Sequence, residues 1–394
     1  MSTPSTKKRR NTAGHPDLSF GNSMPKDGTV IAEPSGGLSR VLSDGSTITV
    51  GLTAVEKTKV IVVSKHTLAG ELDKNYGVWM TPVPNTFVLV DLLIQRDNKP
   101  LLLSAQGDLY TACVTRFNAD QGTVDFSFGD KGTTELGDSF NPHLLIAGAI
   151  AVQATGHIVV VFNDAETSFI YQLNSNGQES NFGNQGPIEA PNTRLDRVLI
   201  TDRGFVLAGS SARKAHILGL LHDGELDHSF GSQGVVVLPF TTNEDRKVDA
   251  LAKDQNGQIV VIGGSFGIPR GMNFVAVLLA SGQLDPQFNE GKPLESEASY
   301  GNYTSGLVQP DGKIVVLARY GNGSIVRLLR FNPNSQPDAT FGIGGIADAW
   351  RDPQGRPEHT EINRVEWVTV NSTLQSSGIL HTSRASFIGR LLSQ

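Results

Sequence analysis

The chain of 394 residues carries 33 basic and 39 acidic side chains, which gives a formal net charge of -6 at pH 7. This acidic balance argues against a nucleic-acid-binding protein, and no apolar run approaches the ~18 residues that a membrane-spanning helix needs. A single cysteine, Cys113, excludes intramolecular disulfides and cysteine-based zinc sites, while 43 glycines and 19 prolines predict a turn-rich, all-β chain.

Residues 1–14 predict a disordered basic tail. Four consecutive basic residues, Lys7 to Arg10, are followed by no apolar segment. A Sec signal peptide needs such a segment of about 7–15 residues, so we expect a protein that is cytoplasmic or exported by a non-Sec route. The alternative function for the basic run is a weak, salt-sensitive contact with an anionic partner.

From residue 15 onward, an aromatic residue recurs at intervals of 48 to 58 residues. It stands in the string Asp-x-Ser-Phe-Gly in 17–21, 125–129 and 227–231, and in looser copies of this string in the other four repeats. The recurring aromatic residues are Phe20, Tyr76, Phe128, Phe182, Phe230, Phe288 and Phe341. Seven ligand pockets would be one interpretation. Repetition in every unit favours packing instead, with the ring buried and the glycine at positive φ.

Each repeat also contains a hairpin pattern. Two apolar runs joined by a turn such as Asp-Gly or Gln-Asn-Gly stand upstream of the aromatic mark, most clearly in 197–209, 250–264 and 306–318. Asp-Gly and Asn-Gly favour hairpin turns because both central residues need positive φ. A third apolar run precedes the mark and a fourth follows it. Four short strands, A to D, in each period predict the blade of a β-propeller.

The two ends of the sequence complement one another. The chain begins with an aromatic mark and a fourth strand, in 15–33, and ends with a third strand, in 385–394. We therefore predict one seven-bladed β-propeller over residues 15–394, with four antiparallel strands per blade. Residues 28–33 should form the outer strand of the last blade, whose other strands come from 363–393, because this closure removes exposed sheet edges at the seam.

The repeat resembles a known family. The string Gln-Pro-Asp-Gly-Lys-Ile at 309–314, together with the recurring Asp-x-Ser-Phe-Gly, is similar to the delta-60 repeat family of bacterial proteins. The resemblance extends over residues 15–394. It implies a repeat-built propeller but no activity, because family members are mostly uncharacterised or are modules of larger cell-surface proteins.

The candidate binding site lies in the connections from strand D to the next strand A. Three of them, 241–249, 295–305 and 349–363, are long, belong to blades five to seven and should share one face. Their candidate ligand-binding residues are Asp245, Arg246, Tyr300, Tyr303, Trp350, Arg351 and His359. Arginines favour carboxylate or phosphate groups, and exposed aromatic rings offer flat area for a sugar or a partner side chain. Solvated loop tips are the alternative interpretation.

No catalytic constellation is visible in the sequence. The main hypothesis is therefore a non-enzymatic β-propeller that binds a protein or glycan partner through these loops, as a lectin if the partner is a glycan. One alternative is a propeller hydrolase or lactonase with a metal site, such as calcium, at the channel mouth. Another is a structural subunit of a larger bacterial toxin or surface assembly. We expect no other cofactor.

Overall fold

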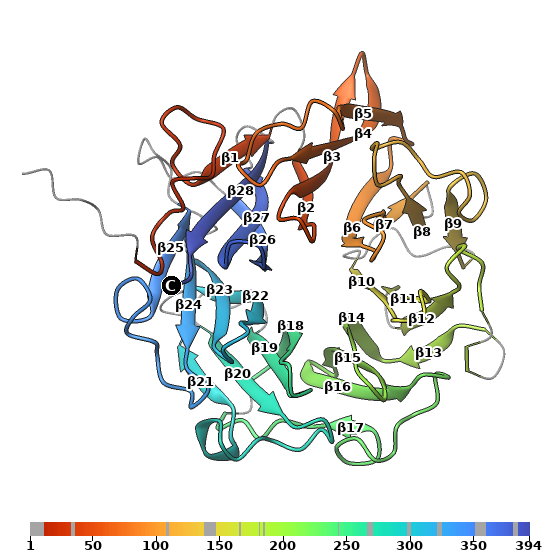
Figure 1. Ribbon diagram of the computed structural model, residues 1–394. Helices are drawn as coiled ribbons and strands as arrows, with labels where there is room; N and C mark the ends of the chain where they lie inside the picture. The colour runs from red at the N-terminus through yellow and green to blue at the C-terminus, as the bar shows by residue number, and fades with distance from the viewer. Residues whose placement is uncertain are drawn as a thin grey trace, which may run out of the picture.

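The computed structural model shows a seven-bladed β-propeller built from seven four-stranded antiparallel sheets (Figure 1). It describes residues 12–32, 36–107, 110–137, 147–164, 167–180, 182–183, 186–242, 244–265, 271–297, 301–320, 325–350, 360–380 and 385–394. Within these ranges, the only helical element is a short 3-10 turn, η1 (Asn289–Gly291), and no helix is long and apolar enough to cross a membrane. The predicted fold class is confirmed.

The strands follow the chain from the centre of each blade to its rim. Blade 1 contains β2 (Gly36–Val41), β3 (Thr47–Val55), β4 (Thr58–His66) and β5 (Val78–Pro82). Blade 2 contains β6 (Phe87–Ile94), β7 (Pro100–Gln106), β8 (Thr111–Arg116) and β9 (Thr133–Leu136). Blade 3 contains β10 (Gly148–Val152), β11 (Ile158–Asn163), β12 (Thr167–Leu173) and β13 (Ile188–Pro191).

The second half of the ring repeats this order. Blade 4 contains β14 (Thr193–Ile200), β15 (Gly204–Ser211), β16 (Lys214–Leu221) and β17 (Val235–Val236). Blade 5 contains β18 (Arg246–Lys253), β19 (Ile259–Ser265), β20 (Met272–Leu278) and β21 (Leu294–Glu297). Blade 6 contains β22 (Asn302–Val308), β23 (Ile314–Tyr320), β24 (Ile325–Phe331) and β25 (Ile346–Trp350). Blade 7 contains β26 (Thr360–Val368), β27 (Thr373–Leu380), β28 (Ala385–Leu392) and β1 (Thr29–Ala32).

Blade 7 closes the ring with strands from both ends of the chain. The red strand β1 lies beside the blue strand β28 in Figure 1, with Val30 opposite Ile388. Ala13 is buried against blades 6 and 7, and the Gly14 N–H donates to the Leu392 carbonyl at 2.8 Å. The predicted closure by residues 28–33 is therefore confirmed. Most of the predicted basic tail, residues 1–11, lies outside the described residues.

The hydrophobic core consists of separate layers between neighbouring blades. Between blades 2 and 3, for example, Leu103 and Val114 pack with Val160 and Phe162. Similar layers join blades 1 and 2, 3 and 4, 4 and 5, 5 and 6, and 6 and 7. Each sheet thus buries both faces, which explains the nearly continuous apolar runs of the middle strands. The innermost strand of each blade presents its free edge to the central channel.

The recurring aromatic residue and the glycine after it join neighbouring blades, and we call this pair the clip. Its seven rings are all buried, as predicted: Phe20, Tyr76, Phe128, Phe182, Phe230, Phe288 and Phe341. In blade 2, the Gly129 N–H donates to the Asn176 carbonyl of blade 3 at 2.8 Å. Gly129 has φ of 55°, and a Cβ there would lie 2.3 Å from the Thr133 carbonyl oxygen. Only glycine fits this turn without strain.

An arginine strengthens the clip in blades 2, 6 and 7. In blade 2, the Arg116 guanidinium lies 4.7 Å from the Phe128 ring centroid, pairs with Asp125 at 2.8 Å and donates to the Ser175 carbonyl of blade 3 at 2.7 Å. The equivalent pairs are Arg330 over Phe341 and Arg390 over Phe20. The repeated motif therefore fastens each blade to the next, and it leaves the channel free for other side chains.

Candidate functional site

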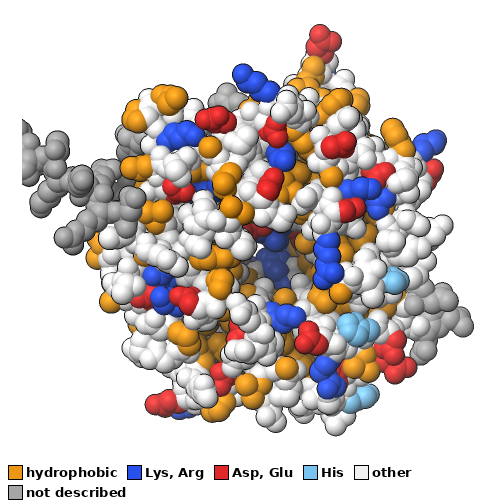
Figure 2. Space-filling view, viewed as in Figure 1, with side chains coloured by type: hydrophobic (Ala, Val, Ile, Leu, Met, Phe, Trp, Pro, Cys, Tyr) orange, Lys and Arg blue, Asp and Glu red, His pale blue; other side chains and the backbone are white. Residues whose placement is uncertain are grey.

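The central channel contains a cavity of about 700 Å³. Residues of all seven innermost strands, β2, β6, β10, β14, β18, β22 and β26, line it. Figure 2 shows the hollow at the centre of the molecule, with basic side chains visible inside. A cavity of this size lies in the usual range for small-molecule sites.

β-Bulges place three polar residues in the lining of this cavity. In β14, β18 and β22 the pairing with the neighbouring strand skips one residue, respectively Asp196, Asp249 and Thr304. A bulged residue is unpaired and its side chain is redirected relative to the regular alternation. All three bulged residues line the cavity, and each lies near the start of its strand. These three polar residues thus lie in the part of the channel closest to the face of the D-to-A connections.

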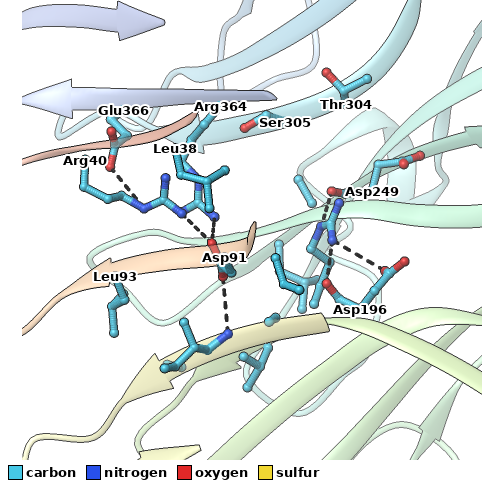
Figure 3. A pocket seen from close by; sticks show the side chains of 18 of the residues that line it. Leu38, Arg40, Asp91, Leu93, Asp196, Asp249, Thr304, Ser305, Arg364 and Glu366 are labelled. Atoms are coloured by element: carbon cyan, nitrogen blue, oxygen red, sulfur yellow. Dashed lines mark hydrogen bonds and ion pairs between the residues drawn. The ribbon is translucent and has the colours of Figure 1, made fainter. Parts of the chain in front are cut away.

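One ion network crosses the channel between blades 7, 1 and 2 (Figure 3). The Asp91 Oδ1 atom accepts from Arg40 Nη2 at 2.5 Å and from Arg364 Nη2 at 3.1 Å. Asp91 Oδ2 accepts from the Ile150 N–H of blade 3 at 3.3 Å, and Glu366 lies 3.9 Å from Arg40 Nε. Burial lowers the pKa of Arg40 to about 10 and raises that of Glu366.

A second charged cluster lies across the cavity on blades 4 and 5. The Arg197 guanidinium donates to the Asp249 carbonyl from Nε and to the Asp196 carbonyl from Nη1, both at 2.5 Å. The Lys247 ammonium pairs with the Asp249 carboxylate. Burial raises the pKa of Asp249, and the neighbouring Asp196 charge acts in the same direction against Lys247 and Arg197. This cluster satisfies backbone carbonyls along the free strand edges.

Three buried polar atoms of the cavity lining have no hydrogen-bond partner: Arg40 Nε, Asp196 Oδ1 and Thr304 Oγ1. Buried polar groups in folded proteins nearly always have such partners, so each exception needs an explanation. A bound polar molecule would supply it. Within the ranges that the structure describes, no three His, Cys, Asp or Glu side chains come together to hold a metal ion. The metal-dependent hydrolase or lactonase therefore stays a hypothesis.

The structure places two of the predicted binding residues inside the protein. Arg246 begins β18 and is 0% exposed, and its guanidinium binds Glu295 Oε2 at 2.8 Å and the Met272 carbonyl at 2.9 Å. Tyr303 lies in β22, is 3% exposed and packs between blades 5 and 6, with its hydroxyl 3.1 Å from Ser296 Oγ. The expectation that both are exposed on loops is wrong, because both strands begin earlier than predicted.

The other predicted residues are described only in part. Asp245 lies on the β17–β18 connection and pairs with Arg213 Nε at 2.5 Å. Trp350 ends β25 opposite Val326, and its side chain is outside the described part. Tyr300, Arg351 and His359 also lie outside the described residues. A shared binding patch on blades five to seven remains a prediction.

The sequence contains a sign of the channel site that the loop analysis missed. The first strand of several hairpins holds a charged residue within an apolar run, as in VLVDLLI (88–94) and KVDALA (247–252). A charge in an otherwise buried strand needs a partner or a polar cavity. Because every first strand lines the ring axis, such charges in several blades would have indicated that they meet there.

Comparisons with known proteins support the fold. Residues 309–341 match the model of a family described as a domain of unknown function, the DUF5122 beta-propeller. This stretch runs from the first hairpin turn of blade 6 to its repeat phenylalanine, and it supports membership of a β-propeller family. No curated protein matches the sequence. The delta-60 repeat remains a resemblance.

Several solved structures are similar to this chain. A protein from Lactobacillus plantarum has a TM-score of 0.50 and 14% identity over 79% of this chain and 86% of that chain. Drosophila Plexin A, in complex with Semaphorin 1b, has a TM-score of 0.50 and 10% identity over 91% and 88%. The PQQ-bound aldose sugar dehydrogenase of Streptomyces coelicolor has a TM-score of 0.46 and 15% identity over 77% and 94%. At identities of 10–14%, the two structures with a TM-score of 0.50 show the fold alone.

Proposed function

We propose that this protein is a binding propeller whose small polar ligand occupies the central channel. The observation that carries the proposal is the cavity of about 700 Å³, whose lining residues Asp196 and Thr304 each have a buried polar atom without a hydrogen-bond partner. A ligand that hydrogen-bonds to these atoms would remove the cost of about 1–3 kcal/mol for leaving each one unsatisfied. The charged clusters on either side would orient it.

The arrangement supports binding more directly than catalysis. Asp91 is held by Arg40 and Arg364, and the Asp249 carboxylate is held by Lys247. Carboxylates neutralised in this way stabilise the ring and position a ligand. A general acid or base needs to be free to exchange a proton with the substrate. We therefore assign these groups to recognition.

A protein or glycan partner on the loops of blades five to seven is the second candidate. Arg213, on the β15–β16 turn, pairs with Asp245 on the adjacent D-to-A connection, and both side chains are exposed by more than a third. Exposed charged groups at the rim of a face favour a partner with complementary charge. The burial of Tyr303 removes one of three aromatic platforms that a glycan would use, so a protein partner is favoured over a glycan.

The channel proposal is tested with a Thr304→Phe variant. A phenylalanine at this bulge would fill part of the cavity, and the Thr304 hydroxyl has no hydrogen-bond partner to lose. We expect small polar molecules that raise the melting temperature of the wild-type protein to have no effect on this variant. Thr304→Ser serves as the matched control and should respond like the wild type. Equal stabilisation of Thr304→Phe by the same ligands would contradict a channel site.

The loop-face candidate needs a separate test by pull-down from host lysate. Arg213→Ala with Asp245→Ala should weaken capture of a partner. The matched control is Glu56→Ala with Lys57→Ala, which changes an exposed charged turn between β3 and β4 in blade 1. If both pairs of changes have the same effect, the sector of blades four and five has no special role.

A further inference from the structure

The charge of the cavity lining differs in sign from the charge of the whole chain. Five basic and four acidic residues line the cavity, whereas the complete sequence carries a net charge of -6. The basic residues are Arg40, Arg197, Lys247, Arg319 and Arg364. The acidic residues are Asp91, Asp196, Asp249 and Glu366. A positive pocket in an acidic protein concentrates anions over the other small molecules in solution.

The surplus positive charge is on Arg319. This residue lies in β23, opposite Asn302 and two positions from the level of the Thr304 bulge. Among the residues described, no carboxylate or carbonyl pairs with its guanidinium, although Arg40, Arg197, Lys247 and Arg364 all have partners. A guanidinium offers two parallel N–H donors, which match a carboxylate better than they match any neutral group.

Two residues of the cavity lining also have buried acceptor atoms without a hydrogen-bond partner. Asp196 Oδ1 lies 3.6 Å from Arg197 Nη1, too far for a hydrogen bond, and Thr304 Oγ1 has no partner. These atoms come from the bulges of blades 4 and 6, and the bulge of blade 5 between them supplies Asp249. A ligand that fits both groups therefore has hydrogen-bond donors at one end and an anionic group at the other.

We propose that the channel ligand is a hydroxylated carboxylate of about the size of an acidic monosaccharide, with its carboxylate on Arg319 and its hydroxyl groups donating to Asp196 and Thr304. This inference rests on the proposed channel site and names the chemical class of its ligand. Hydroxyl groups donate hydrogen bonds without adding positive charge. A carboxylate balances the charge that the lining has in excess.

Two other classes fit less well. An ammonium group would bring positive charge to carboxylates that already have cations close by, with Lys247 on Asp249 and with Arg194 and Arg197 near Asp196. The raised pKa of Asp249 makes the lining still less negative. A neutral sugar would satisfy the acceptors but would leave Arg319 without a counter-charge. A carboxylate with hydroxyl groups is the class that meets both requirements.

Isothermal titration calorimetry with matched probes tests the class. D-Glucuronate is the positive probe, D-glucose lacks its carboxylate, and D-glucosamine replaces a hydroxyl with an ammonium group. We expect glucuronate to bind the wild-type protein at least about 10-fold more tightly than either comparison sugar. Arg319→Gln should lose about 10- to 100-fold in affinity, the usual weight of a charge-assisted hydrogen bond. Thr304→Val should lose several-fold.

Arg96→Gln is the matched control, because it makes the same change in net charge at an exposed turn outside the channel. Its affinity for glucuronate should equal that of the wild type. A parallel titration with a glucuronate-terminated oligosaccharide distinguishes two sources of this ligand chemistry. If the natural ligand is a free acid, glucuronate should bind as tightly as the oligosaccharide. If it is the end of a glycan, free glucuronate should bind more weakly than the oligosaccharide.

The outcomes separate the ligand class from the channel site. Tighter binding of glucose or glucosamine, if Thr304→Phe abolishes it, would overturn the hydroxylated carboxylate and retain the channel. Glucuronate binding that Thr304→Phe does not affect would overturn both. If neither glucuronate nor the oligosaccharide binds at millimolar concentration, the class is wrong, and the melting-temperature screen against Thr304→Phe decides the channel separately.

Discussion

Replacing Phe128 with alanine should destabilise the ring far more than the same change two residues earlier. Phe128 is 0% exposed, and its ring packs so closely against Gly177 of blade 3 that a Cβ on this glycine would lie 2.8 Å from the ring. Phe126, in the same repeat, is 75% exposed. Truncation of a buried phenylalanine costs about 3–5 kcal/mol. Loss of the ring under the Arg116 guanidinium, at 4.7 Å, adds about 1–2 kcal/mol because that cation is buried.

We therefore expect Phe128→Ala to lower the free energy of unfolding by about 4–7 kcal/mol and Phe126→Ala to change it by less than about 0.5 kcal/mol. Urea titrations followed by circular dichroism measure both variants against the wild type. Phe128→Leu separates the two contributions, since it keeps apolar volume but removes the aromatic face. Equal unfolding midpoints for the alanine variants would refute the view that the repeated aromatic residue holds neighbouring blades together.

Three further predictions concern closure, a buried ion pair and acid stability. Removing residues 1–32 should cost several kcal/mol in urea unfolding, because β28 then loses its pairing with β1 and Phe20 leaves the core. Arg246→Ala should cost about 3–5 kcal/mol, because it leaves Glu295 buried without its cation; a double-mutant cycle with Glu295→Gln measures the coupling. Burial alone would raise the pKa of Asp338, but hydrogen bonds from Thr340 and the charges of Arg330 and Lys313 outweigh it and lower the pKa to about 2. The stability that Asp338 contributes is thus complete above its usual pKa near 4 and is lost as the pH falls toward 2, so urea midpoints of wild type and Asp338→Asn should converge in that interval.

Each of these three predictions has a control or a result that would contradict it. Removing residues 1–11 alone should leave the unfolding midpoint unchanged if closure depends on residues 12–32. A near-neutral Arg246→Ala variant would restore the idea of an exposed loop residue. For Asp338, Asp311→Asn is the matched control, because Asp311 is exposed and lies beside the same Lys313; a gap between wild type and Asp338→Asn that does not narrow below pH 4 would contradict the assignment.

The sequence predicted the ring because its repeat specifies local geometry. An aromatic residue equivalent to Phe128 occurs in all seven repeats, and a glycine equivalent to Gly129 follows it in six of them. The same contact between blades is needed at each interface, so the residues that make it recur along the sequence. The closure by β1 followed from counting strands. The repeat pattern involves residues close together in the chain, and the closure follows from counting the strands that it marks, so both can be recognised without coordinates.

The channel site was not predicted because its residues meet only through the ring. Arg364 and Asp91 are 273 positions apart in sequence, yet their side chains form an ion pair in the channel. The misplacement of Arg246 has a related cause. A charged residue at the end of a loop-like string was assigned to the surface, whereas its partner, Glu295, lies 49 positions later in the outer strand of the same blade. A charged residue can be buried when an ion-pair partner offsets the cost, and the local sequence does not show where that partner is.

The closure of blade 7 also affects when the strands can pair during synthesis. Val30 pairs with Ile388, so β1 leaves the ribosome about 360 residues before its partner strand exists. At about 5–20 residues per second this interval is roughly 20–70 s. Blades 1 to 6 can each pair their own strands as they emerge, but β1 stays an unpaired apolar segment throughout, exposed to proteases and to other nascent chains. Ribosome-arrested chains should therefore show protection of residues 12–32 from proteolysis only after β28 has emerged. The nascent protein thus depends on how long one short strand near its N-terminus survives unpaired.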